Sequence, residues 1–157
     1  MTLQLDLVRH ADALPKTPGG SDHERPLSAL GHRQALMLAE RLRDRGSYPE
    51  QVWCSSATRT RSTMAALGYD YTSVAQIEPR IYECEMDTLL ELIAGLRPVI
   101  CRAMIIGHNP GLQDLLAYLC GPEMPDMITA AHARIQLPER PGRPLRGKSR
   151  LREFWAP

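Results

Sequence analysis

Residues 5–13, which read L-D-L-V-R-H-A-D-A, decide the fold and point to the chemistry of this chain. They begin with a short apolar run that ends on the β-branched Val8, a pattern typical of a buried strand. Arg9 and His10 follow at once. Ligands of open α/β sheets bind outside the carboxyl ends of the strands, so this strand delivers a cation and an imidazole to such an edge. The pair is therefore a candidate site, although two polar residues can also simply close a strand.

Apolar runs and amphipathic helices alternate along the rest of the chain. Residues 15–24 are rich in Pro, Gly, Ser and Asp and predict a loop, after which Ser28 is placed to cap a helix that ends at Gly46. Further strands are expected at residues 51–55, 73–78, 103–106, 133–137 and 150–155, the last two as a hairpin or edge pair. Further helices are expected from residues 56–59 to Gly68, over residues 86–96, and after Gly111.

This alternation predicts an α/β fold with a mostly parallel sheet between two layers of helices, an α/β/α sandwich. A chain of 157 residues has the size of one domain, so we expect a single domain over residues 1–157. Residues 138–149 contain several prolines, glycines and cations and are expected to form a flexible basic connector.

Composition argues against several classes of partner. A formal net charge of +1 favours neither nucleic acid nor an anionic membrane, and the basic C-terminal part lacks interleaved aromatic residues. No apolar run approaches the roughly 18 residues of a membrane span, and the N-terminus lacks a signal-peptide pattern, so we expect a cytoplasmic protein. The four scattered cysteines favour buried, reduced thiols over a zinc site or disulfides.

Three strand-to-helix junctions carry the notable polar residues: Arg9 and His10, residues 55–61, and His108. In a parallel sheet these junctions meet at one edge. Two histidines and several arginines suit a phosphoryl group, because arginine holds phosphate oxygens with forked, permanently charged donors. A neutral imidazole beside them can attack phosphorus and form a covalent phosphohistidine. Arg59 and Arg61 lie on opposite sides of their helix, and we expect Arg59 to face the phosphate.

Four motifs together resemble the histidine phosphatase superfamily, which has the phosphoglycerate mutase-like fold. Within the superfamily they are most similar to the short phosphohistidine phosphatases of the SixA type. The motifs are L-V-R-H-A at residues 7–11, R-P-L-S-x-x-G at 25–31, S-S-A-T-R-T-R-S-T at 55–63 and I-I-G-H-N-P-G at 105–111. They occur in the family's order within residues 3 to about 137.

The resemblance implies a metal-independent phosphatase that needs no cofactor. His10 matches the family's nucleophile, and Arg9 matches the neighbouring phosphate-binding arginine. Arg59 matches the arginine at the start of the second helix, and a protonated His108 would donate to the transferring phosphoryl oxygens. Arg25 matches an arginine at the pocket mouth of the short members.

The group that protonates the leaving group stays open among Glu83, Asp12, Asp22 and none. Imidazole has a pKa of about 6.5 and leaves with little help, so a weak or absent acid favours phosphohistidine as the substrate. The chain is also too short for a long lid, which favours a phosphorylated protein. The alternatives are a small phosphorylated substrate for a phosphomonoesterase or mutase-like enzyme, and a non-catalytic domain that binds phosphorylated partners. The sequence does not indicate an oligomeric state.

Other polar residues have ordinary interpretations. His23 and His32 are expected in solvent, and His132 is expected to be structural. Ser55 or Ser56 is expected either to donate a hydroxyl to the site or to cap the second helix.

Overall fold

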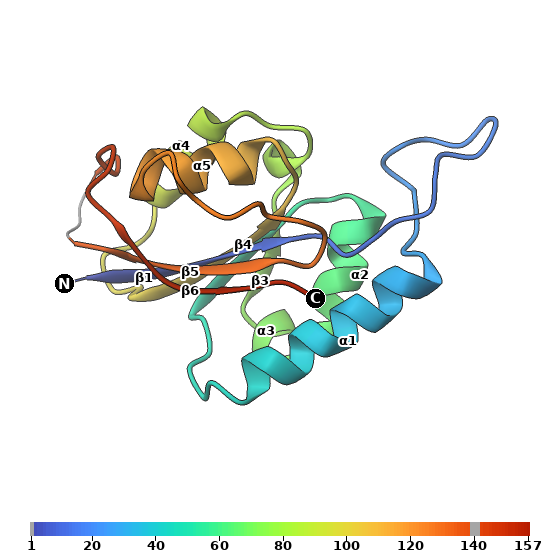
Figure 1. The fold of residues 1–157 in the computed structure, drawn as a ribbon, viewed down its shortest axis with the longest axis horizontal. Helices are drawn as coiled ribbons and strands as arrows, with labels where there is room; N and C mark the ends of the chain where they lie inside the picture. The colour runs from blue at the N-terminus through green and yellow to red at the C-terminus, as the bar shows by residue number, and fades with distance from the viewer. Residues whose placement is uncertain (1, 139–141) are drawn as a thin grey trace.

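The computed structural model describes residues 2–138 and 142–157, which form a six-stranded sheet with helices on both faces (Figure 1). The spatial order of the strands is β3-β2-β4-β1-β5-β6. The first four of these pair in parallel, whereas β5 and β6 are antiparallel. This confirms the predicted mostly parallel sheet and its terminal hairpin. The strands are β1 Leu3–Arg9, β2 Gln51–Cys54, β3 Ala75–Ile77, β4 Arg102–Gly107, β5 His132–Leu137 and β6 Arg150–Trp155.

Two layers of helices cover the sheet, and their division follows the alternation of side chains along the strands (Figure 1). Leu5 and Leu7 of β1 belong to the core shared with α4 and α5, whereas Val8 belongs to the core shared with α1, α2 and α3. The predicted α/β/α sandwich is thereby confirmed. The helices are α1 Ala29–Arg43, α2 Thr58–Leu67, α3 Tyr69–Thr72, α4 Met86–Ala94 and α5 Gly111–Cys120, with a 3-10 turn, η1, at Pro79–Ile81.

A buried carboxylate interrupts the apolar run of β1. Asp6 Oδ1 lies 2.7 Å from Nε2 of His132 and accepts a hydrogen bond from Nε of Arg134 at 2.8 Å, and both partners come from the neighbouring β5. Burial alone would raise the pKa of Asp6, but the hydrogen bonds and charges of His132 and Arg134 hold that pKa below its ordinary value. His132 is thus structural, as predicted.

The helix after the first loop begins where the sequence indicates but ends earlier. Ser28 caps α1, its Oγ accepting a hydrogen bond from the Gly31 amide at 3.0 Å. The expected end at Gly46 is wrong, because α1 ends at Arg43 with Asp44 as its C-cap. Gly46 has φ of 63° and turns the chain beyond the helix instead.

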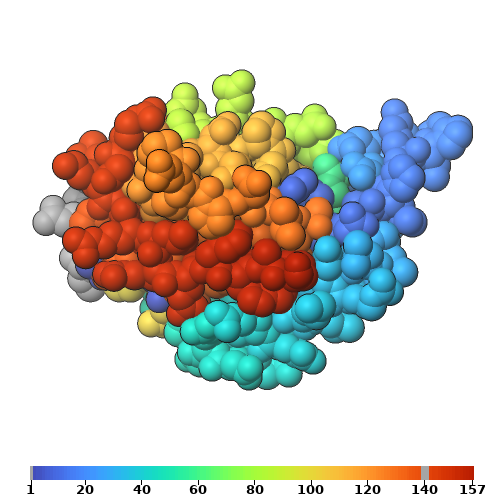
Figure 2. Space-filling view, in the orientation of Figure 1, coloured from blue at the N-terminus to red at the C-terminus, as the bar shows by residue number. Residues whose placement is uncertain are grey.

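The loop between β1 and α1 stands out from the body of the molecule in both overall views (Figures 1 and 2). Its return limb is attached to α2, since the Thr58 amide donates to the His23 carbonyl at 3.0 Å. The loop is therefore fixed beside the carboxyl edge of the parallel strands, where a ligand site is expected.

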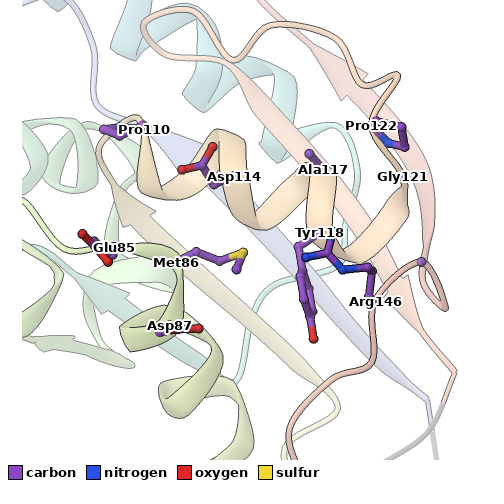
Figure 3. A pocket seen from close by; sticks show the side chains of 11 residues that line it. Glu85, Met86, Asp87, Pro110, Asp114, Ala117, Tyr118, Gly121, Pro122 and Arg146 are labelled. Carbon is purple, nitrogen blue, oxygen red and sulfur yellow. The ribbon is translucent and has the colours of Figure 1, made fainter.

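The connector expected at residues 138–149 lies partly outside the described residues, at 139–141. Its described part contacts α5, because the Gly147 amide donates to the Tyr118 carbonyl at 2.8 Å and the Arg146 guanidinium lies 4.7 Å from the centroid of the Tyr118 ring. Figure 3 shows the groove of about 660 Å³ that this segment borders, with Met86 and Asp114 between α4 and α5.

Cys54 is buried, whereas Cys84, Cys101 and Cys120 are partly exposed, so the expectation of buried cysteines holds only for Cys54. Within the described residues, no helix combines the length and the apolar character that a membrane crossing requires.

Candidate active site

His10 directly follows β1 and is almost completely enclosed, with 8% of its surface exposed. Its Nδ1 lies 2.8 Å from the carbonyl oxygen of Ala11. Because a carbonyl only accepts, Nδ1 carries the proton and the free electron pair of the neutral ring is on Nε2. The backbone therefore selects the tautomer that a nucleophilic imidazole needs.

His108 lies against His10, with 5.2 Å between the ring centroids and 53° between the ring planes. Sheet topology explains this proximity, since β4 is the parallel neighbour of β1 and Gly107 is in register with Arg9. Two imidazoles almost a hundred residues apart in the chain thus lie side by side at one edge of the sheet, as the junction argument predicted.

Ser55 also lies at this edge of the sheet, and it was one of two serines left open by the sequence. The residue follows β2, the other neighbour of β4, and its Oγ lies 2.7 Å from Nε2 of His108. Ser56 instead lies 2.9 Å from Nε2 of His23. His23 is half-buried there and its ring contacts Tyr82 edge-on, so the expectation of a solvated His23 is wrong.

Two arginines flank the imidazoles. Arg9 donates from Nη1 to the carbonyl of Met127 at 3.1 Å. Arg59, only 5% exposed, donates to the backbone carbonyl of Asp22 at 2.8 Å and to its Oδ2 at 3.1 Å. Nε of Arg9, Nε of Arg59 and Nδ1 of His108 are buried and have no hydrogen-bond partner within the described part of the chain. Buried donors without acceptors are costly, and a bound anion would satisfy them.

Asp22 links Arg59 to two further residues, Arg25 and Tyr82. Its Oδ1 accepts from Nη1 of Arg25 at 3.0 Å, and its Oδ2 accepts from the hydroxyl of Tyr82 at 2.6 Å. Arg25 also donates from Nε to the Leu14 carbonyl at 2.7 Å. The Arg25 side chain is 26% exposed, which agrees with its expected place at the pocket mouth.

Both imidazoles are neutral at pH 7, because their pKa values lie well below the ordinary 6.5. Burial lowers the pKa of His10 to about 4, helped by the charges of Arg59, Arg9 and Arg25. Burial and the neighbouring His10 and Arg59 lower the pKa of His108 to about 3, an effect that the Asp22 carboxylate partly opposes. His108 can still donate as a neutral ring, and a protonated His108 beside a phosphoryl group stays a prediction.

Within the described residues, none of the three candidate acids is hydrogen-bonded to His10 or His108, whose ring contacts are with Ala11 and Ser55. Glu83 is exposed on a residue with φ of 51°, and Asp12 Oδ2 accepts from the Ser28 hydroxyl at 2.5 Å. Hydrogen bonds from Tyr82 and Arg25, with the charge of Arg59, hold the pKa of Asp22 far below its ordinary value. Asp22 is thus an ionised carboxylate that has no proton to give.

Sequence reasoning missed two groups of this site, Tyr82 and the carbonyl of Met127. Tyr82 follows η1 at the same edge of the sheet as His108, with 5.6 Å between the two ring centroids. Its position just past a strand and a turn is a signal that could have identified it. The Met127 carbonyl is a backbone group, so no side-chain pattern could reveal it. No group of three or more potential metal ligands occurs within the described residues.

Two imidazoles and two arginines at the carboxyl edge of an α/β sandwich are typical of enzymes that handle phosphate. Residues 5–94 match the family model of the histidine phosphatase superfamily, branch 1. The chain belongs to this superfamily and is a phosphatase, as its motifs indicated.

Known proteins with the same architecture include SixA-type enzymes. The chain is 29% identical over 142 residues to the phosphohistidine phosphatase SixA of Escherichia coli, with 87% of each chain covered. It is 31% identical over 132 residues to an uncharacterized protein of Mycobacterium tuberculosis, which covers 83% of this chain and 81% of that protein. A crystal structure of a candidate phosphohistidine phosphatase SixA from Agrobacterium tumefaciens matches with a TM-score of 0.86, at 26% identity, over 99% of this chain and 98% of that one.

Proposed function

We propose that the chain removes phosphoryl groups from phosphohistidine on proteins, through a covalent intermediate on Nε2 of His10. The observation that carries this proposal is the His10–His108 pair with buried nitrogens of Arg9, Arg59 and His108 that have no partner within the described residues. This arrangement suits a phosphoryl group because its oxygens would accept from those donors while its phosphorus faces an imidazole.

In the first step, Nε2 of His10 attacks phosphorus in line with the bond to the leaving group. The new N–P bond forms as the old bond breaks, and the electron pair of the old bond departs with the leaving group. The Nδ1–H of His10 remains hydrogen-bonded to the Ala11 carbonyl throughout, and this bond stabilises the cationic ring of the intermediate.

Arg9, Arg59 and His108 hold the phosphoryl oxygens during this transfer. If the Ser55 hydroxyl donates to Nε2 of His108, the proton of that ring is on Nδ1, the atom without a partner. His108 is then a neutral donor to the phosphoryl group. Arg25, at the rim, helps to neutralise the incoming dianion.

In the second step, water attacks phosphorus from the side that the leaving group has left. The bond from His10 Nε2 to phosphorus breaks, its electron pair returns to the ring, and the water hydrogens leave with inorganic phosphate or pass to solvent. His10 is regenerated as a neutral imidazole without a metal or a cofactor.

Asp22 is the candidate acid that contacts an arginine of the site, and its ionised state supports a P–N substrate over an alkyl ester. An alkoxide needs a proton as it leaves, whereas imidazole, with a pKa of about 6.5, departs as a stable neutral base. The partly exposed rim formed by Arg25 and Asp22 also supports a substrate presented on another protein.

Turnover of phosphohistidine and of a nitrophenyl phosphate, with a chelator present, tests the proposal. We expect His10→Ala to lower kcat at least a thousandfold for both substrates, and acid-labile phosphate to be trapped on His10 of the unsubstituted protein. His32→Ala, which changes an exposed histidine of α1, is the matched control and should keep full activity. Full activity in His10→Ala would overturn the proposal.

A further inference from the structure

We infer that Asp22 determines specificity, because its carboxylate accepts a hydrogen bond from the distal ring N–H of a phosphorylated imidazole and thereby favours this substrate over phosphate esters. The inference rests on the function proposed above. It makes the Asp22 carboxylate a hydrogen-bond acceptor for the leaving imidazole, which is the opposite of an acid that gives a proton to the leaving group.

The carboxylate is held by two arginines and a tyrosine hydroxyl. Arg25 donates to Oδ1 at 3.0 Å, Arg59 donates to Oδ2 at 3.1 Å, and Tyr82 donates to Oδ2 at 2.6 Å. Its charge also reaches His108, where it opposes part of the lowering of the pKa. Asp22 is thus held beside the site by Arg59 and by Tyr82, whose ring centroid lies 5.6 Å from that of His108.

The leaving group of an in-line attack lies opposite the nucleophile. His10 and Arg59 are almost fully buried, whereas the side chains of Asp22 and Arg25 are 35% and 26% exposed. The substrate enters through this open side, so its leaving group is on the side where Asp22 lies. The leaving group would then be within reach of the exposed Asp22 carboxylate.

Asp22 can also accept one more hydrogen bond. A carboxylate offers about four acceptor positions, and three are occupied by the donors from Arg25, Arg59 and Tyr82. Oδ1 receives only one of these donors within the described residues. One more N–H can bind there, and the three existing donors keep the carboxylate ionised to receive it.

The chemistry of a phosphorylated imidazole uses such an acceptor. Its ring is a cation when the distal nitrogen is protonated. As the N–P bond breaks, the electron pair returns to the ring, which leaves as neutral imidazole with the distal N–H still bonded to Asp22. No proton moves in this step. A hydrogen bond to the carboxylate favours the protonated, reactive form of the substrate.

A phosphate ester gains nothing from the same contact. Its leaving oxygen has no distal N–H, it develops negative charge, and the ionised Asp22 supplies no proton. The carboxylate therefore lowers the transition state for P–N cleavage and repels the leaving group in P–O cleavage. The two substrate classes should respond in different ways when this charge is removed.

The test compares the kcat/KM of Asp22→Asn for phosphorylated imidazole and for 4-nitrophenyl phosphate. We expect kcat/KM for phosphorylated imidazole to fall at least tenfold, and that for the ester to stay within about threefold or to rise. The effect on phosphorylated imidazole should be largest above pH 6.5, where free substrate tends to lose its distal proton. Asp70→Asn, an exposed aspartate of α3, is the control for the loss of one negative charge.

The outcomes separate the possible roles of Asp22. An equal loss for both substrates would mean that the residue only holds Arg59 in place, which overturns the inference. Unchanged activity on phosphorylated imidazole would overturn it too. If the unsubstituted protein turned over neither substrate, the proposed function itself would fail. That result is distinct from a changed ratio of kcat/KM values in Asp22→Asn, which tests only the role of Asp22.

Discussion

The hydroxyl of Ser55 is the hydrogen-bond partner of Nε2 of His108, and through this contact it affects whether the other ring nitrogen, Nδ1, carries the proton. Ser55 is fully buried, and its Oγ also accepts from the amide of Ala57 at 3.3 Å. With that amide as a donor to Oγ, the hydroxyl hydrogen is free to point at Nε2 of His108. One serine thus selects which nitrogen of a neutral imidazole carries the proton.

Ser55→Ala should lower kcat about tenfold to a hundredfold and change KM little, because the tautomer of His108 is no longer fixed while the arginines stay in place. Steady-state kinetics with a nitrophenyl phosphate measures both constants, and ¹⁵N spectra of the imidazole report the tautomer. Ser62→Ala, on α2, is the control. A fall in stability with unchanged kcat would mean that the serine has only a structural role.

Single residues show how far the sequence alone could predict the site. His10 and His108 were predictable because each follows a strand, and parallel strands bring such positions to one edge. The contacts of Asp22 with Arg59 and Tyr82 could not be predicted. They join three segments of the chain whose positions follow neither from hydrophobic periodicity nor from strand register. Asp22 appeared in the sequence only as a possible acid, whereas its neighbours keep it ionised.

At the scale of elements, the start of α1 positions the segment that follows His10. A Cβ atom added to Gly31 would lie 1.9 Å from the carbonyl oxygen of Asp12, so only glycine fits there. The amide of Ser28 donates to this same carbonyl at 3.0 Å. The R-P-L-S-x-x-G motif therefore has a packing role, because its glycine lets the helix approach the chain two residues after His10.

Gly31→Ala should destabilise the protein by about 1–3 kcal/mol, since the added methyl group displaces backbone and not a flexible side chain. It should also lower kcat by moving the segment that holds His10. Urea denaturation gives the free energy of unfolding. Gly95→Ala, where the new Cβ would meet nothing closer than 3.4 Å, should be neutral or slightly stabilising. Equal stability of the two variants would contradict this account of the motif.

Boundaries of elements were less predictable than their existence. Every predicted strand and long helix is present, yet α1 ends at Arg43 and the short α3 was not expected. Gly46 seemed a natural stop, but a glycine with positive φ also serves in the turn after a helix. A glycine in the sequence therefore indicates that the chain turns, but it does not determine which residue is the last in the helix.

At the scale of the whole molecule, two buried neutral imidazoles link stability to pH. The pKa of His10 is lowered to about 4 and that of His108 to about 3, from an ordinary value of 6.5. Between pH 4 and 6.5 the unfolded chain therefore binds protons that the folded protein excludes. The free energy of unfolding falls as the pH drops through this window.

We expect each imidazole to contribute up to about 1.4 kcal/mol per pH unit to this loss between pH 6.5 and 4. Urea denaturation at several pH values measures the slope. His10→Gln should reduce the slope, because it removes one of the two groups, whereas His32→Gln, at an exposed position, should not. A free energy of unfolding that did not change across this window would show that the imidazoles are charged in the folded protein.

The buried nitrogens of Arg9, Arg59 and His108 that lack a partner within the described residues also bear on how a catalytic cycle ends. Inorganic phosphate, the final product, offers all of them acceptors at once, and no group of the described chain competes for these atoms. Product release must leave these donors unpaired again, so we expect departure of phosphate to be slow compared with departure of imidazole. Accumulated phosphate will then act as an inhibitor that also makes the folded protein more resistant to heat.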